Sequence, residues 1–172
     1  MRFGVCAPIS EAARLYKIGF DYVEVSAASL AARTEEEFAA FCAENRAAPI
    51  HAEAANCLFP GEIRLTGDAV DTDAVQSYID RVMARLGDAG IGIAVFGSGG
   101  SRRVPEGFSE TRALEQLRDT ARRLGEAAAA HGVTVVLEPL RRAGYDARVS
   151  FEGSASDYEA ELPAALEVLR NA

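Results

Sequence analysis

Two short apolar runs near the end of the chain limit its fold most strongly, because very few residues separate them. The first run covers 133–138 and the second covers 148–152, and they end on Glu138 and Glu152. Neighbouring parallel strands need a crossover of about a dozen or more residues, usually a helix. The linker 140–147 could span roughly 26 Å at about 3.3 Å per residue, but it leaves no chain for a helix. The second strand therefore cannot follow the first by the usual strand–helix–strand unit.

The first of these runs has the composition of a buried strand. It is rich in β-branched residues and is bounded by Gly132 and Pro139, which indicates a parallel strand covered on both faces. Glu138 then stands at the carboxyl end of that strand, and Glu152 ends the next one. Ligands gather beyond the carboxyl ends of strands in α/β folds, so these two carboxylates are the first candidates for a functional site.

The preceding part of the chain alternates between strand and helix patterns. Its helix ends carry the usual signals, with Ser10 as a cap and Gly19 as a stop, and with Thr34 and Glu37 as a capping box. Regular alternation calls for parallel strands with helices outside them. The sequence therefore predicts an α/β fold, a shortened or partial (β/α) TIM-like barrel or its open relative, with about six mainly parallel strands. The strands are expected at 2–7, 21–26, 49–54, 91–96, 133–138 and 148–152.

Apolar residues at three- and four-residue spacing predict the helices. The clearest helix covers 71–89, and another begins after Ser109 and stops at His131. A shorter helix is expected at 34–45, and a last one follows a capping box formed by Ser156 and Glu159. The apolar stripes are Val75, Tyr78, Ile79, Val82, Met83 and Leu86; Leu114, Leu117, Ala121, Leu124 and Ala128; Phe38, Phe41 and Cys42; and Leu162, Leu166 and Leu169.

Composition bounds the class of protein. The 172 residues, 49% of them hydrophobic, suit one domain with a substantial core. The 26 acidic and 18 basic residues give a net charge of −8, which argues against a nucleic-acid-binding face. No apolar run approaches the roughly 20 residues of a membrane span, and the N-terminus has no signal-type pattern, so we expect a cytoplasmic protein without a membrane partner. Cys6, Cys42 and Cys57 lack the close spacing of a zinc site and are expected to be buried, reduced thiols.

Five short stretches, taken in their order, resemble the sugar phosphate isomerase/epimerase family. These proteins are xylose-isomerase-like TIM barrels and include hydroxypyruvate isomerases and ketose 3-epimerases. The resemblance covers nearly the whole chain and rests on the order of the stretches rather than on any one of them. The stretches are GFDYVE at 19–24, NCLFPG at 56–61, the loop 97–108, VLEPL at 136–140 and GYDARVSFE at 144–152.

The resemblance also implies a shortened barrel. Barrels of this family have eight strands, and typical (β/α)₈ barrels need about 250 residues. By resemblance, residues 1–140 correspond to barrel units one to five, and 144–172 correspond to unit eight with its terminal helix. Units six and seven are then missing at the linker 141–143. The expected organisation is a single partial-barrel domain over 1–172.

For the two glutamates, the resemblance implies a metal-binding and an acid/base role. The family holds a divalent ion with Glu, Asp, His and Glu at the ends of strands five to eight, and Glu138 looks like the first ligand and Glu152 like the last. The same pair transfers protons on opposite faces of a substrate carbon. The Asp and the His have no counterpart here, and two carboxylates alone bind such ions weakly. Two interpretations stay open: a site for Mn²⁺, Mg²⁺ or Zn²⁺, or strand-end carboxylates that face solvent or pair with arginine and bind no metal.

Three further residues are candidates for contact with a substrate. Glu24 and Asn56 stand at strand ends and line the pocket by resemblance only, while Arg102 could clamp an anionic substrate. Arg103 could do the same, and solvent-facing loop arginines are an equal alternative. The loop 97–100 could approach a ligand through backbone N–H groups, although ordinary turn chemistry also explains its glycines.

The two histidines carry less weight. His51 lies near the third strand and could replace a missing metal ligand, but a lone histidine is more often a hydrogen-bonded structural residue. His131 precedes a glycine at a predicted helix end, where a histidine is favourable without any ligand. We therefore expect both to be structural.

Two hypotheses of different kinds follow for the function. The first is a metal-assisted isomerase or epimerase that transfers protons on a small ketose or hydroxy-carbonyl substrate. The second is a shortened, catalytically inactive relative that is maintained as an oligomer. Removal of two units leaves open edges at the fifth and last strands. We therefore expect a homodimer in which open sheets meet or terminal strands are exchanged.

Overall fold

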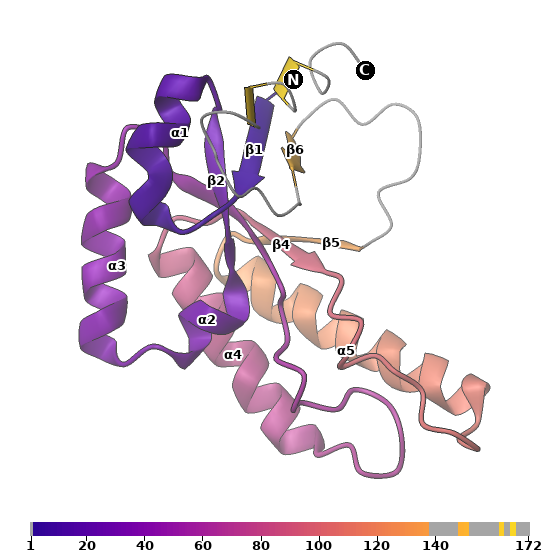
Figure 1. Cartoon of the computed structure of the whole chain (residues 1–172). Helices are drawn as coiled ribbons and strands as arrows, with labels where there is room; N and C mark the ends of the chain where they lie inside the picture. The colour runs from indigo at the N-terminus through magenta and orange to yellow at the C-terminus, as the bar shows by residue number, and fades with distance from the viewer. Residues whose placement is uncertain (1, 138–147, 152–161, 164–165, 168–172) are drawn as a thin grey trace. The chain divides into compact units, whose positions relative to one another are not determined.

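The computed structural model describes residues 2–137, 148–151, 162–163 and 166–167 (Figure 1). Strands and helices alternate along the chain, as the sequence predicts, and the chain divides into two compact units. Unit 1 comprises 1–25, 34–54 and 140–172, and unit 2 comprises 26–33 and 55–139. The elements are β1 (Arg2–Cys6), η1 (Ile9–Glu11), α1 (Ala12–Ile18), β2 (Tyr22–Ser26), α2 (Ala27–Ala32), α3 (Glu35–Ala47), β3 (Ala52–Asn56), α4 (Thr72–Asp88), β4 (Ile93–Phe96), α5 (Glu110–Ala130), β5 (Thr134–Leu137) and β6 (Arg148–Phe151).

The strands of unit 1 lie in the order β3-β2-β1-β6. β1 pairs in parallel with β2, and Cys6 lies opposite Glu24. On its other side β1 pairs in parallel with β6, and Val5 lies opposite Phe151. The last strand therefore pairs with the first strand, which agrees with a linker too short for a crossover helix after β5.

Local signals explain how the helices of unit 1 begin and end. The capping box of α3 forms as predicted: the Thr34 hydroxyl accepts the Glu37 N–H at 3.2 Å, and the Glu37 carboxylate accepts the Thr34 N–H at 2.8 Å. α1 ends at Gly19, whose φ of 107° lies in the left-handed region that favours glycine. The predicted cap at Ser10 is wrong, because η1 occupies that position and α1 begins after Glu11 without a side-chain cap.

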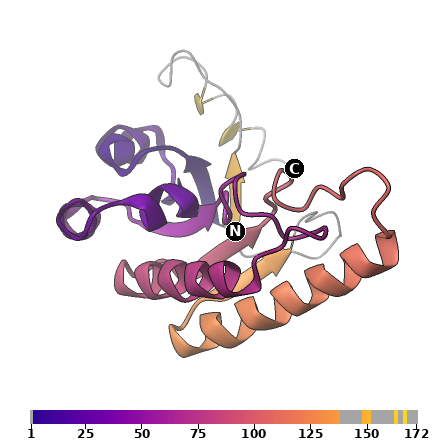
Figure 2. The same cartoon turned by 90° about the horizontal axis from the view of Figure 1, so that it is seen from below.

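Unit 2 is built on two long amphipathic helices. Figure 2 shows α4 and α5 side by side, next to the parallel pair of β4 and β5. Asp71 caps α4 by accepting the Ala74 N–H at 2.9 Å, and Ser109 caps α5 by accepting the Arg112 N–H at 3.4 Å. The inner faces of these helices form the core of the unit. Its fully buried side chains include Ile79, Met83, Leu86 and Leu124.

The short helix α2 is absent from the sequence prediction. Ser26 caps its first turn by accepting the Ser29 N–H at 3.2 Å. Its last turn is held by the buried guanidinium of Arg85 in α4, which donates to the carbonyl oxygens of Leu30 and Arg33, each at 2.7 Å. A side chain more than 50 positions away in sequence therefore satisfies the exposed carbonyls at the end of this helix.

Several expected details differ in the structure. β3 begins at Ala52 and ends at Asn56, two to three residues later than predicted, so Asn56 ends a strand instead of opening a loop. In α5, Leu114 is 48% exposed, although its spacing predicts an inner position. Cys57 is exposed, whereas a buried thiol was expected. No helix within the described residues is long and apolar enough to cross a membrane.

The largest difference concerns β5. Its apolar composition predicts a strand that is buried on both faces, and that prediction is wrong. Thr134 and Leu137 are exposed, and Val135 and Val136 are only half-buried. β5 pairs in parallel with β4 along its length. The strand thus has the sequence of a central parallel strand and the exposure of an edge strand.

Candidate functional site

Glu138 and Glu152, the predicted catalytic and metal-binding pair, lie outside the described residues. The residues before them in sequence are described: Leu137 ends β5 and Phe151 ends β6. Leu137 lies opposite Phe96, the last residue of β4. Because these strands run parallel to their neighbours, each glutamate follows a strand at the carboxyl edge of its own unit, where α/β folds bind ligands.

Glu24 is the middle residue of β2 in unit 1, although the sequence predicts it at a strand end. Its side chain is buried, with the residue only 8% exposed, and its backbone carbonyl accepts the Ala7 N–H at 3.1 Å. The other end of β1 carries a different acidic contact. There the carboxylate of Glu53 accepts from both terminal nitrogens of Arg2 and raises the pKa of that guanidinium further. Unit 1 therefore places a buried carboxylate inside β2, two residues before the strand ends.

In unit 2, side chains of one loop join the segments that follow β3 and β4. The Ser98 hydroxyl accepts the Phe59 N–H at 2.9 Å, and the Ser101 hydroxyl donates to the Pro60 carbonyl at 2.9 Å. The backbone adds a bond from the Leu65 N–H to the Ser101 carbonyl at 3.0 Å. These bonds hold two loops together at the carboxyl ends of neighbouring elements. Ser98 lies within the loop 97–100 that the sequence marks as either ligand-binding or ordinary turn, and Ser101 directly follows it.

Aromatic side chains fill the space beneath these loops. The ring of Phe59 lies 5.4 Å from that of Tyr78 and 5.7 Å from that of Phe96, measured between centroids. The Tyr78 hydroxyl donates to the Leu58 carbonyl at 2.8 Å. Burial raises the pKa of Tyr78 to about 12, although nearby Arg81 opposes this shift. Tyr78 therefore stays neutral at ordinary pH and serves as a fixed hydrogen-bond donor.

Asn56 and Arg102 are the two predicted substrate contacts of unit 2. Asn56 is half-buried at the end of β3, and the next residue, Cys57, has a φ of 45°. Arg102 is half-buried in the loop after β4, and its guanidinium lies over the Phe96 ring at 5.4 Å. Arg103 is exposed. The joined loops bring the segments that carry Asn56 and Arg102 together, while Glu24 belongs to unit 1.

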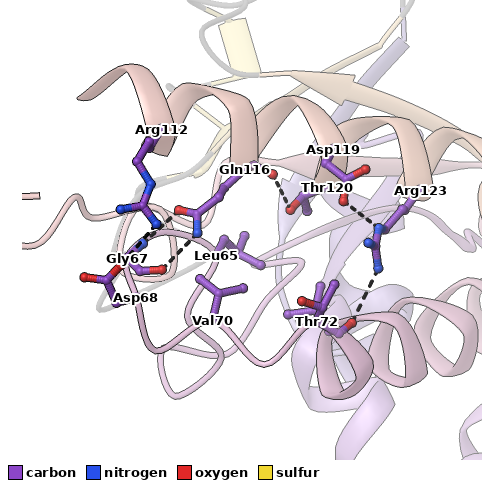
Figure 3. Close-up of a pocket in the computed structure, with 11 residues that line it drawn as sticks. Leu65, Gly67, Asp68, Val70, Thr72, Arg112, Gln116, Asp119, Thr120 and Arg123 are labelled. Atoms are coloured by element: carbon purple, nitrogen blue, oxygen red, sulfur yellow. Dashed lines mark hydrogen bonds and ion pairs between the residues drawn. The ribbon is translucent and has the colours of Figure 1, made fainter. Parts of the chain in front are cut away.

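A pocket of about 180 Å³ lies elsewhere in unit 2, between the loop before α4 and the side of α5 (Figure 3). Gln116 exchanges two hydrogen bonds with the backbone of Gly67, both at 2.9 Å. Arg112 pairs with Asp68 at 3.2 Å, and Arg123 pairs with Asp119 at 2.7 Å. The bonds of Gln116 and Arg112 join α5 to the loop, whereas the pair of Arg123 and Asp119 lies within α5. We interpret the pocket as the fastening of this loop to α5 and not as a reaction site.

The family's divalent ion finds no site among the residues that the structure describes. Within 2–137 and the three short described segments, no group of three His, Cys, Asp or Glu side chains lies together in a way that could hold a metal. His51 does not supply a ligand in such a group: its Nδ1 lies 2.7 Å from the Asn45 carbonyl oxygen. His131 ends α5, as predicted. The described residues therefore lack a set of ligands that could hold the ion.

Sequence patterns alone miss the clamp between the two loops. Ser98, Ser101 and the aromatic cluster around Phe59 depend on partners that lie about 40 positions away in sequence. The sequence does contain one signal for this clamp, which is the pair of serines among the glycines of residues 97–101. Ser98 has a φ of 23°, so the turn holds a serine where glycine is the easier choice.

Comparisons with known proteins agree with the parallel arrangement of these strands. The chain is similar to a 3-keto-D-glucoside 4-epimerase from E. coli, with 21% identity over 83% of this chain and 57% of that one and a TM-score of 0.61. It is similar to a D-psicose 3-epimerase from Clostridium cellulolyticum H10, with 15% identity, coverage of 80% and 52%, and a TM-score of 0.61. A xylose isomerase domain protein from Planctomyces limnophilus shares 24% identity, with coverage of 78% and 52% and a TM-score of 0.56.

At these identities the solved structures establish the fold, and the chain spans about half of their length. This partial coverage fits a shortened barrel. A search among curated proteins found no match. The model of one protein family, described as xylose isomerase-like TIM barrel, matches residues 12–170. The chain therefore belongs to the xylose isomerase-like TIM barrel family.

Proposed function

We propose that this chain acts as a sugar isomerase or epimerase on a small ketose or hydroxy-carbonyl substrate. One observation carries the proposal: Glu138 and Glu152 each directly follow the last residue of a parallel strand, Leu137 and Phe151. The membership in the xylose isomerase-like family supports it, as does the similarity to epimerases of sugars. The whole reaction stays a proposal, because the chain covers about half of those proteins.

The proposed chemistry is a proton transfer between two carboxylates. One glutamate removes the proton from the carbon next to the substrate carbonyl, and the other returns a proton to the same or the neighbouring carbon. Removal and return on opposite faces invert the carbon, which is an epimerisation. Return to the neighbouring carbon moves the carbonyl, which is an isomerisation. Glu138 and Glu152 are the proposed pair, and any Mn²⁺, Mg²⁺ or Zn²⁺ that they bind needs ligands beyond the described residues.

Glu24 and Asn56 are the proposed groups that orient the substrate. Glu24 is 8% exposed in the middle of β2, and Asn56 is half-buried at the end of β3. Carboxylate and amide oxygens accept hydrogen bonds from the hydroxyl groups of a sugar, and the amide also donates to its carbonyl. Their positions on strands give such contacts a rigid base.

The assignment of residues 144–172 to barrel unit eight is also proposed. Its support is the parallel pairing of β6 with β1, because a closed barrel brings its last strand beside its first. Leu162 and Leu166, which belong to the predicted terminal helix, are buried, as an outer barrel helix requires. Residues 1–140 then supply units one to five of the same partial-barrel domain.

Exchange of substrate hydrogen with solvent tests the proposed reaction. The chain is incubated with D-fructose, D-tagatose or the anionic hydroxy-carbonyl compound hydroxypyruvate in D₂O, with and without added Mn²⁺, and loss of the proton next to the carbonyl is followed by NMR. We expect exchange in the wild type and a loss of about 10²-fold or more in Glu138→Gln and in Glu152→Gln. Glu115→Gln, on the exposed face of α5, is the matched control and should exchange like the wild type. Equal exchange in all four proteins, or none in the wild type, would sink the proposal.

The exposure of β5 favours a second candidate, a catalytically inactive relative maintained as a homodimer. Leu137 is 58% exposed at the end of a strand whose composition suits burial. Cover from a second copy would remove this apolar edge from water. We expect sedimentation to show a dimer that Leu137→Glu weakens, while Tyr16→Glu, at an equally exposed residue of α1, leaves it intact. A monomeric wild type would contradict this candidate.

A further inference from the structure

Arg102 carries an unsatisfied donor. The Nε atom of its side chain is buried and has no hydrogen-bond partner among the described residues. A buried N–H without an acceptor is costly, so a folded protein usually supplies one from itself or from a ligand. Buried Arg85 of the same unit illustrates the usual solution, because its guanidinium donates to the carbonyls of Leu30 and Arg33.

The position of Arg102 is fixed by its neighbours. The backbone N–H of Arg102 donates to the Ser98 carbonyl at 3.2 Å. On one side of it, the Ser101 hydroxyl donates to the Pro60 carbonyl. On the other side, the Arg103 carbonyl accepts from the Thr66 hydroxyl at 2.7 Å. The guanidinium lies on the ring of Phe96, which is itself only 2% exposed. An arginine that is anchored through its backbone and its flat face loses little freedom when its edge binds a ligand.

The surroundings of Arg102 suit a small anion. The loop beside it contains Gly99, where an added Cβ would meet none of the described atoms within 4 Å. The net charge of the chain is −8, so unspecific attraction of anions is weak and binding needs a local cation. The residue also follows β4, at the same strand edge as Leu137, which precedes Glu138.

We propose that Arg102 binds an oxyanion, a carboxylate or a phosphate, side-on through its Nε–H and one terminal N–H. A planar guanidinium offers two parallel donors to such a group. Given the proposed function, on which this step rests, the oxyanion is the charged end of the substrate. The substrate class is therefore a small anionic hydroxy-carbonyl compound rather than a neutral sugar.

Titration with unreactive anions tests this site independently of turnover. Inorganic phosphate and glycolate, which represent the two sources of an oxyanion, are added to ¹⁵N-labelled protein while the arginine Nε–H signals are followed by NMR. We expect one of the two probes to shift the Arg102 signal in a saturable manner. By calorimetry, Arg102→Gln should weaken that binding by about tenfold or more. Arg103→Gln, which removes the neighbouring exposed arginine, should bind as the wild type does.

The outcomes separate this inference from the proposed reaction. Neither probe carries a carbon that the proposed reaction would epimerise, so saturable binding supports the oxyanion site even in a chain that shows no solvent exchange. Which probe binds decides between phosphate and carboxylate. Absence of a saturable shift for both probes overturns the inference. The inference is also overturned if the Arg102 Nε–H signal moves in Glu138→Gln without added anion, because Arg102 would then have a partner within the protein.

Discussion

Two glycines within helices differ in what surrounds them, and this difference predicts opposite effects of one substitution. Gly125 lies inside α5, and a Cβ added there would meet none of the described atoms within 4 Å. Gly87 lies in the last turn of α4, where an added Cβ would be 2.9 Å from the carbonyl oxygen of His131 and 3.0 Å from its Cβ. Both positions have helical backbone that alanine adopts easily.

The magnitudes follow from two terms. Alanine in place of glycine stabilises a helix interior by about 0.5–1 kcal/mol. Overpacking against neighbours that cannot move destabilises by about 1–3 kcal/mol. A backbone carbonyl is such a neighbour. We therefore expect Gly125→Ala to raise the free energy of unfolding by about 0.5–1 kcal/mol and Gly87→Ala to lower it by about 0.5–2.5 kcal/mol.

Urea unfolding followed by circular dichroism measures both variants beside the wild type. Because the helix term enters both variants with the same sign, their difference reports mainly the contact with His131, about 1–3 kcal/mol. For a chain of this size that corresponds to a difference in Tm of roughly 2–12 °C. Equal stabilities of the two variants would refute the close approach of α4 and the end of α5.

Three further changes test other contacts. Arg85→Met should cost about 1.5–3 kcal/mol, because the carbonyls of Leu30 and Arg33 lose a charged donor, whereas Arg81→Met on the exposed side of α4 should change stability little in the same urea assay. Gly4→Ala should cost about 3 kcal/mol, because the new Cβ would overlap the buried Tyr22 ring, and the loss should shrink when Tyr22 is already replaced by leucine. Because the pKa of Tyr78 is about 12 in the folded chain and about 10 when unfolded, its contribution is complete below pH 10 and is lost as pH rises toward 12. Alkaline unfolding curves should therefore fall less steeply in Tyr78→Phe, and identical slopes would contradict the burial of this hydroxyl.

Local patterns were sufficient for the elements whose signals are local. The capping box of Thr34 and Glu37 and the stripe of α4 are visible in the sequence because every partner lies within a few residues. α2 was not visible, because its last turn depends on Arg85 from another helix. β3 was placed too early because Ala-rich strands give little contrast at their ends. Long-range partners, rather than propensities, decided these two elements.

The exposure of β5 and of Leu114 shows a different limit of pattern reasoning. Composition and spacing report what a strand or helix is suited to contact, and not whether that neighbour is present. β5 and α5 carry the apolar residues of a continuing barrel, and the chain covers about half the length of solved family structures. The same argument applies to the site: Asn56 could be assigned to a strand end from sequence, whereas the loop clamp around Ser98 could not. The assignment of Glu24 to a strand end was wrong, because β2 continues to Ser26.

We propose above that Glu138 and Glu152 exchange protons with one substrate. The most direct measurement is the separation of their carboxylates in a crystal structure of the chain with bound D-fructose or glycolate. The account predicts carboxyl oxygens on two sides of one carbon, about 6 Å apart, which is twice the reach of a hydrogen bond. Carboxylates separated by more than twice that distance, in a chain with the strand pairing described above, would contradict it.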